Sequence, residues 1–204
     1  MPGPLSSLYE RIGGSALFAL SLPVVAASGI VTFVLSKRSP FVAHLRVGQH
    51  GKPLWVWKLR TMWDNGPVAG TERGWVEYIV AEPQDDWKDR ADQRVRSRFA
   101  AFCRRHSIDE LPQLAQVALG ELSLIGPRPL TRTEIGKHYG DRADELLSVK
   151  PGLTGLWQVR GRSELNWRER VSLDLELVRN PNWRIRAEIA ARTAFAVMTG
   201  KGAW

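Results

Sequence analysis

A long uncharged segment near the N-terminus constrains the fold of this chain more than any other feature. Residues 12–36 read IGGSALFALSLPVVAASGIVTFVLS and contain no charged side chain. A helix of about 20 apolar residues matches the hydrocarbon core of a bilayer, which is about 30 Å thick. The segment is therefore expected to enter a membrane. Three forms of it compete: a cleaved signal peptide, a spanning helix and a re-entrant helical hairpin.

The small residues and the proline of the segment bear on this choice. VVAASG offers the small residues of a signal-peptide cleavage site, but the apolar run continues past it to Leu35, further than a signal peptide needs. Pro23 lies near the middle, where it removes one intrahelical hydrogen bond, and Ser21 can supply part of the missing bonding. A hairpin bent at Ser21 and Pro23 and a kinked spanning helix explain these residues almost equally well.

Basic residues after the apolar segment indicate its orientation. Lys37, Arg38 and four further cations up to residue 60 follow closely, and such residues favour the cytoplasmic side of a membrane. We therefore expect a membrane-inserted segment at residues 1–38 and a cytoplasmic, membrane-associated domain at residues 39–204. The whole chain carries 29 Lys and Arg against 21 Asp and Glu, which indicates an anionic partner such as a phosphorylated substrate, lipid headgroups or nucleic acid. The single Cys103 excludes an internal disulfide.

Hydrophobic periodicity predicts a mostly helical α+β fold for the domain. Residues 45–62 have the pattern of a β-hairpin with its turn at Gly51, whereas residues 64–93 and 149–167 are expected to be loops or irregular structure. Helices are predicted at about 94–105, 109–118, 168–178 and 183–198. The last of these mixes apolar and basic residues, which suits a helix at the membrane interface and a helix packed on the domain core equally well.

Two adjacent acids stand at the start of the predicted helix 109–118. Proline is tolerated only in the first turn of a helix, so Pro112 places Asp109 at or beside the N-cap and Glu110 in the first turn. The ordinary interpretation is that Asp109 caps the helix and Glu110 complements its dipole, and that neither residue takes part in chemistry.

Cations in neighbouring segments favour a reactive interpretation of the same acids. They are Lys58, Arg60, Arg104, Arg105 and Arg128. Arginine side chains bind phosphate oxygens well, and a carboxylate can attack phosphorus while cations stabilise the charge that develops. A carboxylate pair also suits Mg²⁺, which takes few protein ligands and bridges substrate phosphates. Both interpretations remain open, because distance along the sequence does not show whether these groups meet.

Four motifs together resemble the bacterial sugar transferases, which are small monotopic phosphoglycosyl transferases of glycan assembly. The motifs are RVGQHGKPLWVWKLRTM, SIDELPQLAQVALGELSLIGPRPL, KPGLTGLWQVRGR and RERVSLDLELV. The resemblance implies transfer of a sugar 1-phosphate from a UDP-sugar to undecaprenyl phosphate with release of UMP, as the first membrane step of exopolysaccharide, O-antigen or glycoconjugate assembly. It also implies a re-entrant membrane helix-hairpin, interfacial amphipathic helices and a small catalytic domain on the cytoplasmic face of the bacterial inner membrane.

The resemblance further assigns roles to individual residues. Asp109 matches the nucleophile that forms a covalent phosphosugar intermediate, and Glu110 matches its partner acid in proton transfer or metal binding. Mg²⁺ is the implied cofactor, held by these two acids. The residues expected to bind phosphate or substrate are Lys58, Arg60, Arg104, Arg128 and Arg162. The expected partners are a UDP-sugar, undecaprenyl phosphate and inner-membrane lipids, with a second copy of the chain as a further candidate and no nucleic acid.

One departure from the family pattern bears on activity. The last helix usually carries an Asp seven residues before a Thr, but the residue seven before Thr193 is Arg186. Either Glu188 or Asp174 compensates for this reversed charge, or the chain is a catalytically impaired relative that binds a nucleotide sugar or lipid-linked sugar at the membrane. A nucleic-acid-binding protein is disfavoured, because the basic residues are dispersed and no nucleic-acid motif is present.

Overall fold

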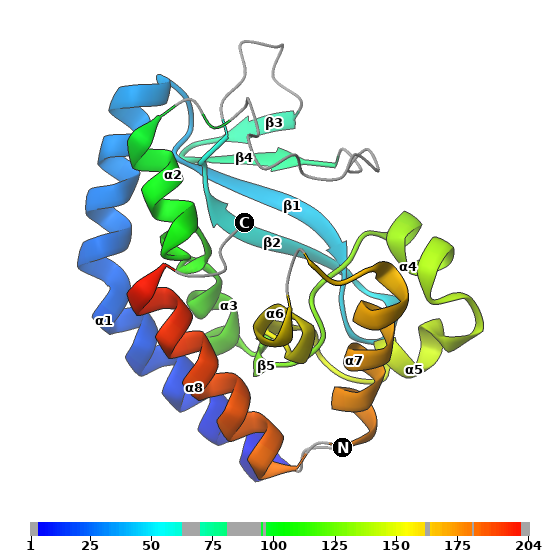
Figure 1. Cartoon of the computed structure of the whole chain (residues 1–204). Helices are drawn as coiled ribbons and strands as arrows, with labels where there is room; N and C mark the ends of the chain where they lie inside the picture. Colours follow the sequence, from blue (N-terminus) through cyan, green and yellow to red (C-terminus); the bar gives the residue numbers. More distant parts are fainter. Residues whose placement is uncertain are drawn as a thin grey trace.

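The computed structural model describes residues 4–62, 70–80, 95, 97–161, 164–180 and 182–200. Its α-helices are α1 (Pro4–Ser36), α2 (Arg98–Arg105), α3 (Gln113–Leu119), α4 (Arg132–His138), α5 (Ala143–Leu147), α6 (Leu156–Arg160), α7 (Trp167–Arg179) and α8 (Trp183–Thr199). Its strands are β1 (Phe41–Val47), β2 (Pro53–Leu59), β3 (Gly70–Arg73), β4 (Val76–Ile79), β5 (Ser123–Ile125) and β6 (Gly152–Thr154), and single 3-10 turns are η1 (Gln49–Gly51), η2 (Ile108–Glu110) and η3 (Gly140–Arg142). α1 runs along one side of the molecule and α4, α5 and α7 lie on the other (Figure 1). The mostly helical α+β fold class is confirmed.

The first two strands form the hairpin that the sequence predicts. β1 and β2 pair antiparallel, from Phe41 opposite Leu59 to Val47 opposite Pro53. The turn passes through Gly51, whose φ of 76° is a left-handed conformation that costs glycine little because it has no Cβ. The order of the four-stranded sheet is β2-β1-β4-β3, so β2 is an edge strand.

Two of the segments predicted to be irregular contain regular structure. β3 and β4 form an antiparallel hairpin within residues 64–93, and β4 also pairs in parallel with β1. β6 and α6 fall within residues 149–167. The prediction was wrong here because elements of three to five residues carry too little hydrophobic periodicity to be recognised. In addition, β4 pairs with β1 and β6 pairs with β5, both distant in the sequence.

α1 is a single continuous helix that passes through Pro23. The hydroxyl of Ser21 donates to the carbonyl of Phe18 at 2.8 Å, and the helix ends at Ser36, where Lys37 takes a left-handed conformation (φ 56°). A proline removes one backbone hydrogen bond without obliging the chain to turn back. The hairpin bent at Ser21 and Pro23 is therefore not confirmed.

α1 turns small residues toward the protein and large apolar residues outward. Gly14, Ser21, Val25, Ser28 and Thr32 are buried. The exposed residues include Leu17, Leu20, Leu22, Ile30, Val31, Phe33, Val34 and Leu35. Small residues at the packed face and large apolar ones outside are typical of helices surrounded by lipid. The helical segment Ser7–Ser36 is long and apolar enough to cross a membrane, and an 18-residue stretch of it has a mean hydropathy of 2.2.

The buried face of α1 packs on α3, which in turn packs on β2. A Cβ added to Gly14 would come within 2.7 Å of Cγ1 of Val117, so only glycine allows this approach of the two helices. The same Val117 joins Leu54 and Val56 of β2 and Leu122 in an apolar cluster. α3 thus connects the apolar helix with the edge strand of the sheet.

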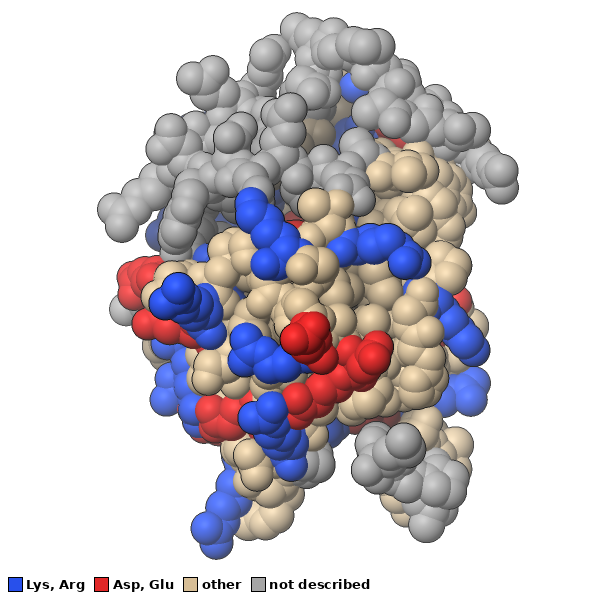
Figure 2. Space-filling model, turned by 90° about the vertical axis from the view of Figure 1, so that its right-hand side faces the viewer, with Lys and Arg blue, Asp and Glu red and all other residues tan. Residues whose placement is uncertain are grey.

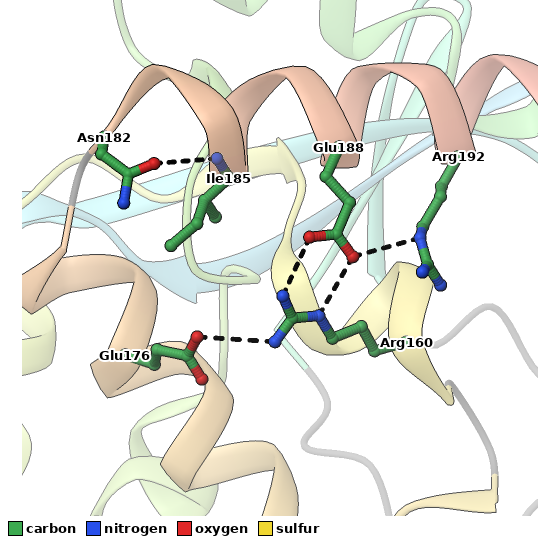
Figure 3. A network of polar contacts seen from close by, with 6 residues as sticks. All are labelled: Arg160, Glu176, Asn182, Ile185, Glu188 and Arg192. Atoms are coloured by element: carbon green, nitrogen blue, oxygen red, sulfur yellow. Dashed lines mark hydrogen bonds and ion pairs between the residues drawn. The ribbon is translucent and has the colours of Figure 1, made fainter.

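The two C-terminal helices confirm the predicted helices 168–178 and 183–198. Ile189 of α8 is fully buried with Leu156 of α6 and Leu177 of α7, so one face of α8 packs on the domain core. Arg160 of α6 joins the three helices, because its guanidinium contacts Glu188 of α8 at 2.9 Å and Glu176 of α7 at 3.4 Å (Figure 3).

Candidate active site

Asp109 lies in the turn η2 between α2 and α3, not at the N-cap of α3. The N-cap position of α3 is Pro112, and no side chain caps that helix. The turn begins at Ser107, a non-glycine residue in the left-handed region (φ 54°). Such conformations cost energy and persist where the surrounding fold imposes them. The ordinary interpretation of Asp109 as a helix cap was wrong, because the chain turns sharply before the helix begins.

The carboxyl group of Asp109 is buried close to several charged groups. Its side chain is 8% exposed. Burial raises the pKa of Asp109 to about 6, the charges of Lys58 and Arg104 act in the opposite direction, and Glu110 adds to the rise. A poorly solvated carboxylate beside cations has the properties that a nucleophile needs.

Glu110 connects two of the predicted cations. Its Oε1 atom accepts a hydrogen bond from Nζ of Lys58 at 2.6 Å and lies 3.8 Å from Nη1 of Arg128. These side chains are between 22% and 31% exposed, so the cluster is at the surface. The structure therefore brings Lys58, Arg104 and Arg128 together around Asp109 and Glu110, as the phosphate-binding interpretation expects.

Gln116 positions Lys58 by binding the backbone of β2. Its Nε2 donates to the carbonyl of Trp55 at 2.7 Å, and its Oε1 accepts from the amide of Trp57 at 3.0 Å. Gln116 is fully buried, so it replaces a neighbouring strand at this edge of the sheet. This role was not predicted from the sequence; the only signal for it is a polar residue on the apolar face of a predicted helix.

Three glycines hold the segment that carries Arg128. A Cβ on Gly126 would lie 2.9 Å from the amide nitrogen of Gly152, and a Cβ on Gly155 would lie 2.6 Å from the carbonyl oxygen of Gly126. The amide of Gly152 donates to the carbonyl of Pro127 at 2.7 Å. This contact between two backbones fixes the Gly-Pro-Arg-Pro segment, because neither strand leaves room for a side chain.

Cys103 connects the acidic pair with α1. Its thiol is buried, and it lies within hydrogen-bonding range of the Ser28 hydroxyl of α1. Burial raises the pKa of Cys103 to about 11, and the charge of Asp109 adds to the rise. Asp109 is therefore close to the C-terminal half of α1.

One residue expected to bind substrate, Arg60, is not in this cluster. Arg60 is 4% exposed, its guanidinium pairs with Glu77 of β4, and its Nε donates to the carbonyl of Ser39 at 2.7 Å. Arg60 thus joins neighbouring parts of the sheet, and a buried pair of this kind does not offer its charge to a ligand. Arg162 lies outside the described residues.

Arg186 has an acidic partner that the sequence analysis did not consider. Its guanidinium pairs with Oε1 of Glu10 on α1, and the hydroxyl of Ser123 donates to Oε2 of the same carboxylate at 2.7 Å. Glu188 instead binds Arg160 and Arg192 (Figure 3).

The other proposed compensator also has a different role. Asp174 is fully buried and accepts a hydrogen bond from the Tyr139 hydroxyl at 2.6 Å. Neither Glu188 nor Asp174 therefore compensates for Arg186. Glu10 lies 18 residues before Ser28 on α1, which corresponds to about 27 Å of helix, so the reversed charge is remote from Asp109.

The acidic pair fits the requirements of a magnesium ion. Mg²⁺ is usually bound by one or two carboxylates and completes its shell with water and substrate phosphates. Asp109 and Glu110 supply that number of carboxylates. Among the residues that the structure describes, no group of three or more His, Cys, Asp or Glu side chains could hold a metal.

Comparison with known proteins places these features in a family context. The family model described as bacterial sugar transferase matches residues 4–200. The chain is 35% identical over 205 residues to a UDP-galactose-lipid carrier transferase of Erwinia amylovora, with 98% of the chain and 42% of that protein covered. The chain thus spans less than half the length of that relative.

Two further relatives are covered by the chain over more than two thirds of their own length. One is the exopolysaccharide production protein ExoY of Sinorhizobium fredii, which is 34% identical over 197 residues, with 93% of the chain and 83% of the relative covered. The other is a UDP-glucose:undecaprenyl-phosphate glucose-1-phosphate transferase of Caulobacter vibrioides, which is 32% identical over 210 residues, with 97% of the chain and 71% of the relative covered.

Proposed function

The chain belongs to the bacterial sugar transferases, and on that premise we propose that it moves a sugar 1-phosphate from a UDP-sugar to undecaprenyl phosphate and releases UMP. The observation that carries the proposal is the buried carboxylate of Asp109 among the cations Lys58, Arg104 and Arg128. Names of the relatives support the substrate class, since one includes a UDP-sugar donor, an undecaprenyl-phosphate acceptor and a sugar 1-phosphate.

In the first step, a carboxylate oxygen of Asp109 attacks the β-phosphorus of the UDP-sugar. A bond forms between this oxygen and phosphorus, and the bond from phosphorus to the bridging oxygen breaks. The bridging oxygen keeps the electron pair and leaves as part of UMP. Lys58 and Arg128 stabilise the negative charge that develops on the phosphoryl oxygens. Glu110 orients Lys58 through its hydrogen bond of 2.6 Å.

In the second step, a phosphate oxygen of undecaprenyl phosphate attacks the same phosphorus. The bond to Asp109 breaks, the carboxylate is restored, and the product is a sugar joined to the lipid by a diphosphate. Asp109 and Glu110 would hold a magnesium ion, which when bound neutralises charge on the substrate phosphates. Glu110 also accepts a proton from the attacking phosphate, the role of partner acid that the family resemblance implies.

The proposed location is the cytoplasmic face of the bacterial inner membrane. Support comes from the outward apolar face of α1 and from the cations that follow it. The proximity of Cys103 to Ser28 and Asp109 would place the reacting carboxylate beside the membrane helix, where a lipid-linked phosphate can reach it. The same features suit the first membrane step of exopolysaccharide synthesis.

A catalytically impaired relative is the alternative that Arg186 suggested. The ion pair of Arg186 with Glu10 offers a different explanation of this departure from the family pattern. The residue at this position is basic instead of acidic, and its partner is an acid on α1. Since Asp109, Glu110 and Lys58 are all in place, no described feature favours the impaired alternative.

The test is a UMP-release assay across UDP-sugars, with the full chain in detergent micelles and undecaprenyl phosphate as acceptor. We expect UMP release with at least one donor, dependent on the lipid for repeated turnover. Replacing Glu110 by Gln should lower the rate severely, while the exposed Glu169→Gln variant on α7 serves as a control. No UMP with any donor would mean that catalysis is the wrong assignment.

A further inference from the structure

Two arginines that do not contact the acidic pair, Arg46 and Arg170, lie near Arg128. Arg46 lies near the end of β1, next to Val47, whose amide donates to the carbonyl of Leu130 at 2.8 Å. This bond brings β1 against the segment that carries Arg128. Arg170 comes from α7, and its guanidinium lies 4.9 Å from the ring of Trp157 and 5.4 Å from the ring of Trp167. We call Arg46, Arg128 and Arg170 the arginine trio.

The three guanidiniums of the trio bring positive charges close together. Burial lowers the pKa of Arg46 and of Arg170, and the charge of Arg128 lowers both further. Glu134 is the carboxylate that acts on both in the opposite direction. Its Oε2 atom already accepts hydrogen bonds from the amide and hydroxyl of Thr131 in the capping box of α4. Glu110 lies 3.8 Å from Arg128 but is also bound by Lys58. The three partly buried guanidiniums repel one another, and an anion would relieve that repulsion.

We propose that the arginine trio binds the phosphate of the nucleoside monophosphate, first as part of the donor and then as the leaving group. This inference rests on the proposed function. Arg128 is the shared member, because it lies 3.8 Å from Glu110 at the reacting end and within electrostatic range of Arg46 and Arg170 at the other. Arg46 and Arg170 thus extend the site beyond the group that is transferred.

The position of the trio favours the water-soluble phosphate over the lipid phosphate. α7 and α4 lie across the molecule from α1, whose outer face is apolar (Figure 1). The face on which α4, α5 and α7 lie carries interspersed basic and acidic side chains (Figure 2), as a water-exposed surface does. A lipid-linked phosphate reaches Asp109 from the side of α1, so the trio on the opposite side is left for the nucleotide.

The experiment uses the full chain in detergent micelles and compares Arg46→Gln and Arg170→Gln with the control Arg142→Gln. Arg142 is exposed in η3 on the same side of the molecule. Calorimetry gives the Kd for UMP, and kinetics give KM for undecaprenyl phosphate. We expect each trio variant to weaken UMP binding about ten- to hundredfold, since each loses a charged hydrogen bond. The control should bind UMP as the wild type does, and KM for the lipid should stay the same in all three variants.

Several outcomes would overturn the inference or separate it from the proposed reaction. Unchanged UMP binding in both trio variants refutes the nucleotide site even when wild-type turnover is normal. A raised KM for undecaprenyl phosphate with unchanged UMP binding assigns the trio to the lipid phosphate instead. Wild-type protein that binds UMP through the trio but releases none from any donor keeps the site and refutes the reaction. Arg170→Lys retains the charge, so it should bind UMP more tightly than Arg170→Gln; equal loss in both, with a lowered Tm, would indicate a packing role only.

Discussion

Asp174 is a buried acid whose protonation should make the stability of the fold depend on pH. It is fully buried on α7, and burial raises its pKa from 3.8 to about 7, partly offset by the hydrogen bond from Tyr139. Because the pKa is higher in the folded protein than in the unfolded chain, folding favours the neutral form. The corresponding stability is fully present below pH 4 and is lost as the pH rises through 7.

The size of the effect follows from the two pKa values. They differ by about three units, and each unit corresponds to about 1.4 kcal/mol. The wild type should therefore lose on the order of 4 kcal/mol between pH 4 and pH 8 from this one group. For a chain of this length that amounts to roughly 10 °C in Tm.

The perturbation is Asp174→Asn, which stays neutral at every pH and can still accept the hydrogen bond from Tyr139. Thermal unfolding of variant and wild type, followed by circular dichroism in detergent micelles, gives the difference in Tm from pH 4 to pH 8. We expect a small difference at pH 4 that grows in favour of the variant up to pH 8. The exposed Asp141→Asn is the control and should run parallel to the wild type. If the Tm of Asp174→Asn changes with pH in parallel with that of the wild type, the carboxyl group of Asp174 does not titrate as its burial requires.

Three further predictions concern the site and the packing of α1. Lys58→Gln should lower kcat about 10²- to 10³-fold, because it removes a cation from the developing charge; a kcat within threefold of the wild type, measured by UMP release, would remove Lys58 from the reaction. Gly14→Ala should lower stability by about 1–3 kcal/mol through overpacking, whereas the neighbouring Gly13→Ala has room and should not; equal Tm values for the two would contradict the close approach of α1 and α3. A double-mutant cycle of Glu10→Gln and Arg186→Gln should give a coupling energy of about 1 kcal/mol, and additive losses would show that the pair contributes nothing.

Long elements were predictable from the sequence because they carry their own signal. The apolar run, the hairpin around Gly51 and the last two helices depend on composition and periodicity within one segment. β3, β4 and β6 were missed because strands of three or four residues carry too little periodicity, and β4 and β6 also pair with strands distant in the sequence. The sequence could not show whether α1 is continuous, because Pro23 is compatible with a kink, a bend or a nearly regular helix.

The candidate site was predictable in composition but not in arrangement. Asp109, Lys58 and Arg128 were identified from residue type and motif, and the structure brings them together. Arg60 was misassigned because it follows the end of β2 at Leu59, where its guanidinium is buried and pairs with Glu77 of β4. The partner of Arg186 was missed because Glu10 is 176 residues away, and no pattern in the sequence reports a contact of that kind.

The central claim is that Asp109 carries the sugar phosphate between donor and acceptor. The direct measurement is mass spectrometry of the intact chain after incubation with a UDP-sugar in the absence of undecaprenyl phosphate. We predict one added sugar phosphate, located on the peptide that contains Asp109, lost when the lipid is supplied and absent from Asp109→Asn. An adduct that persists in Asp109→Asn, or one that maps to another residue, would contradict the account.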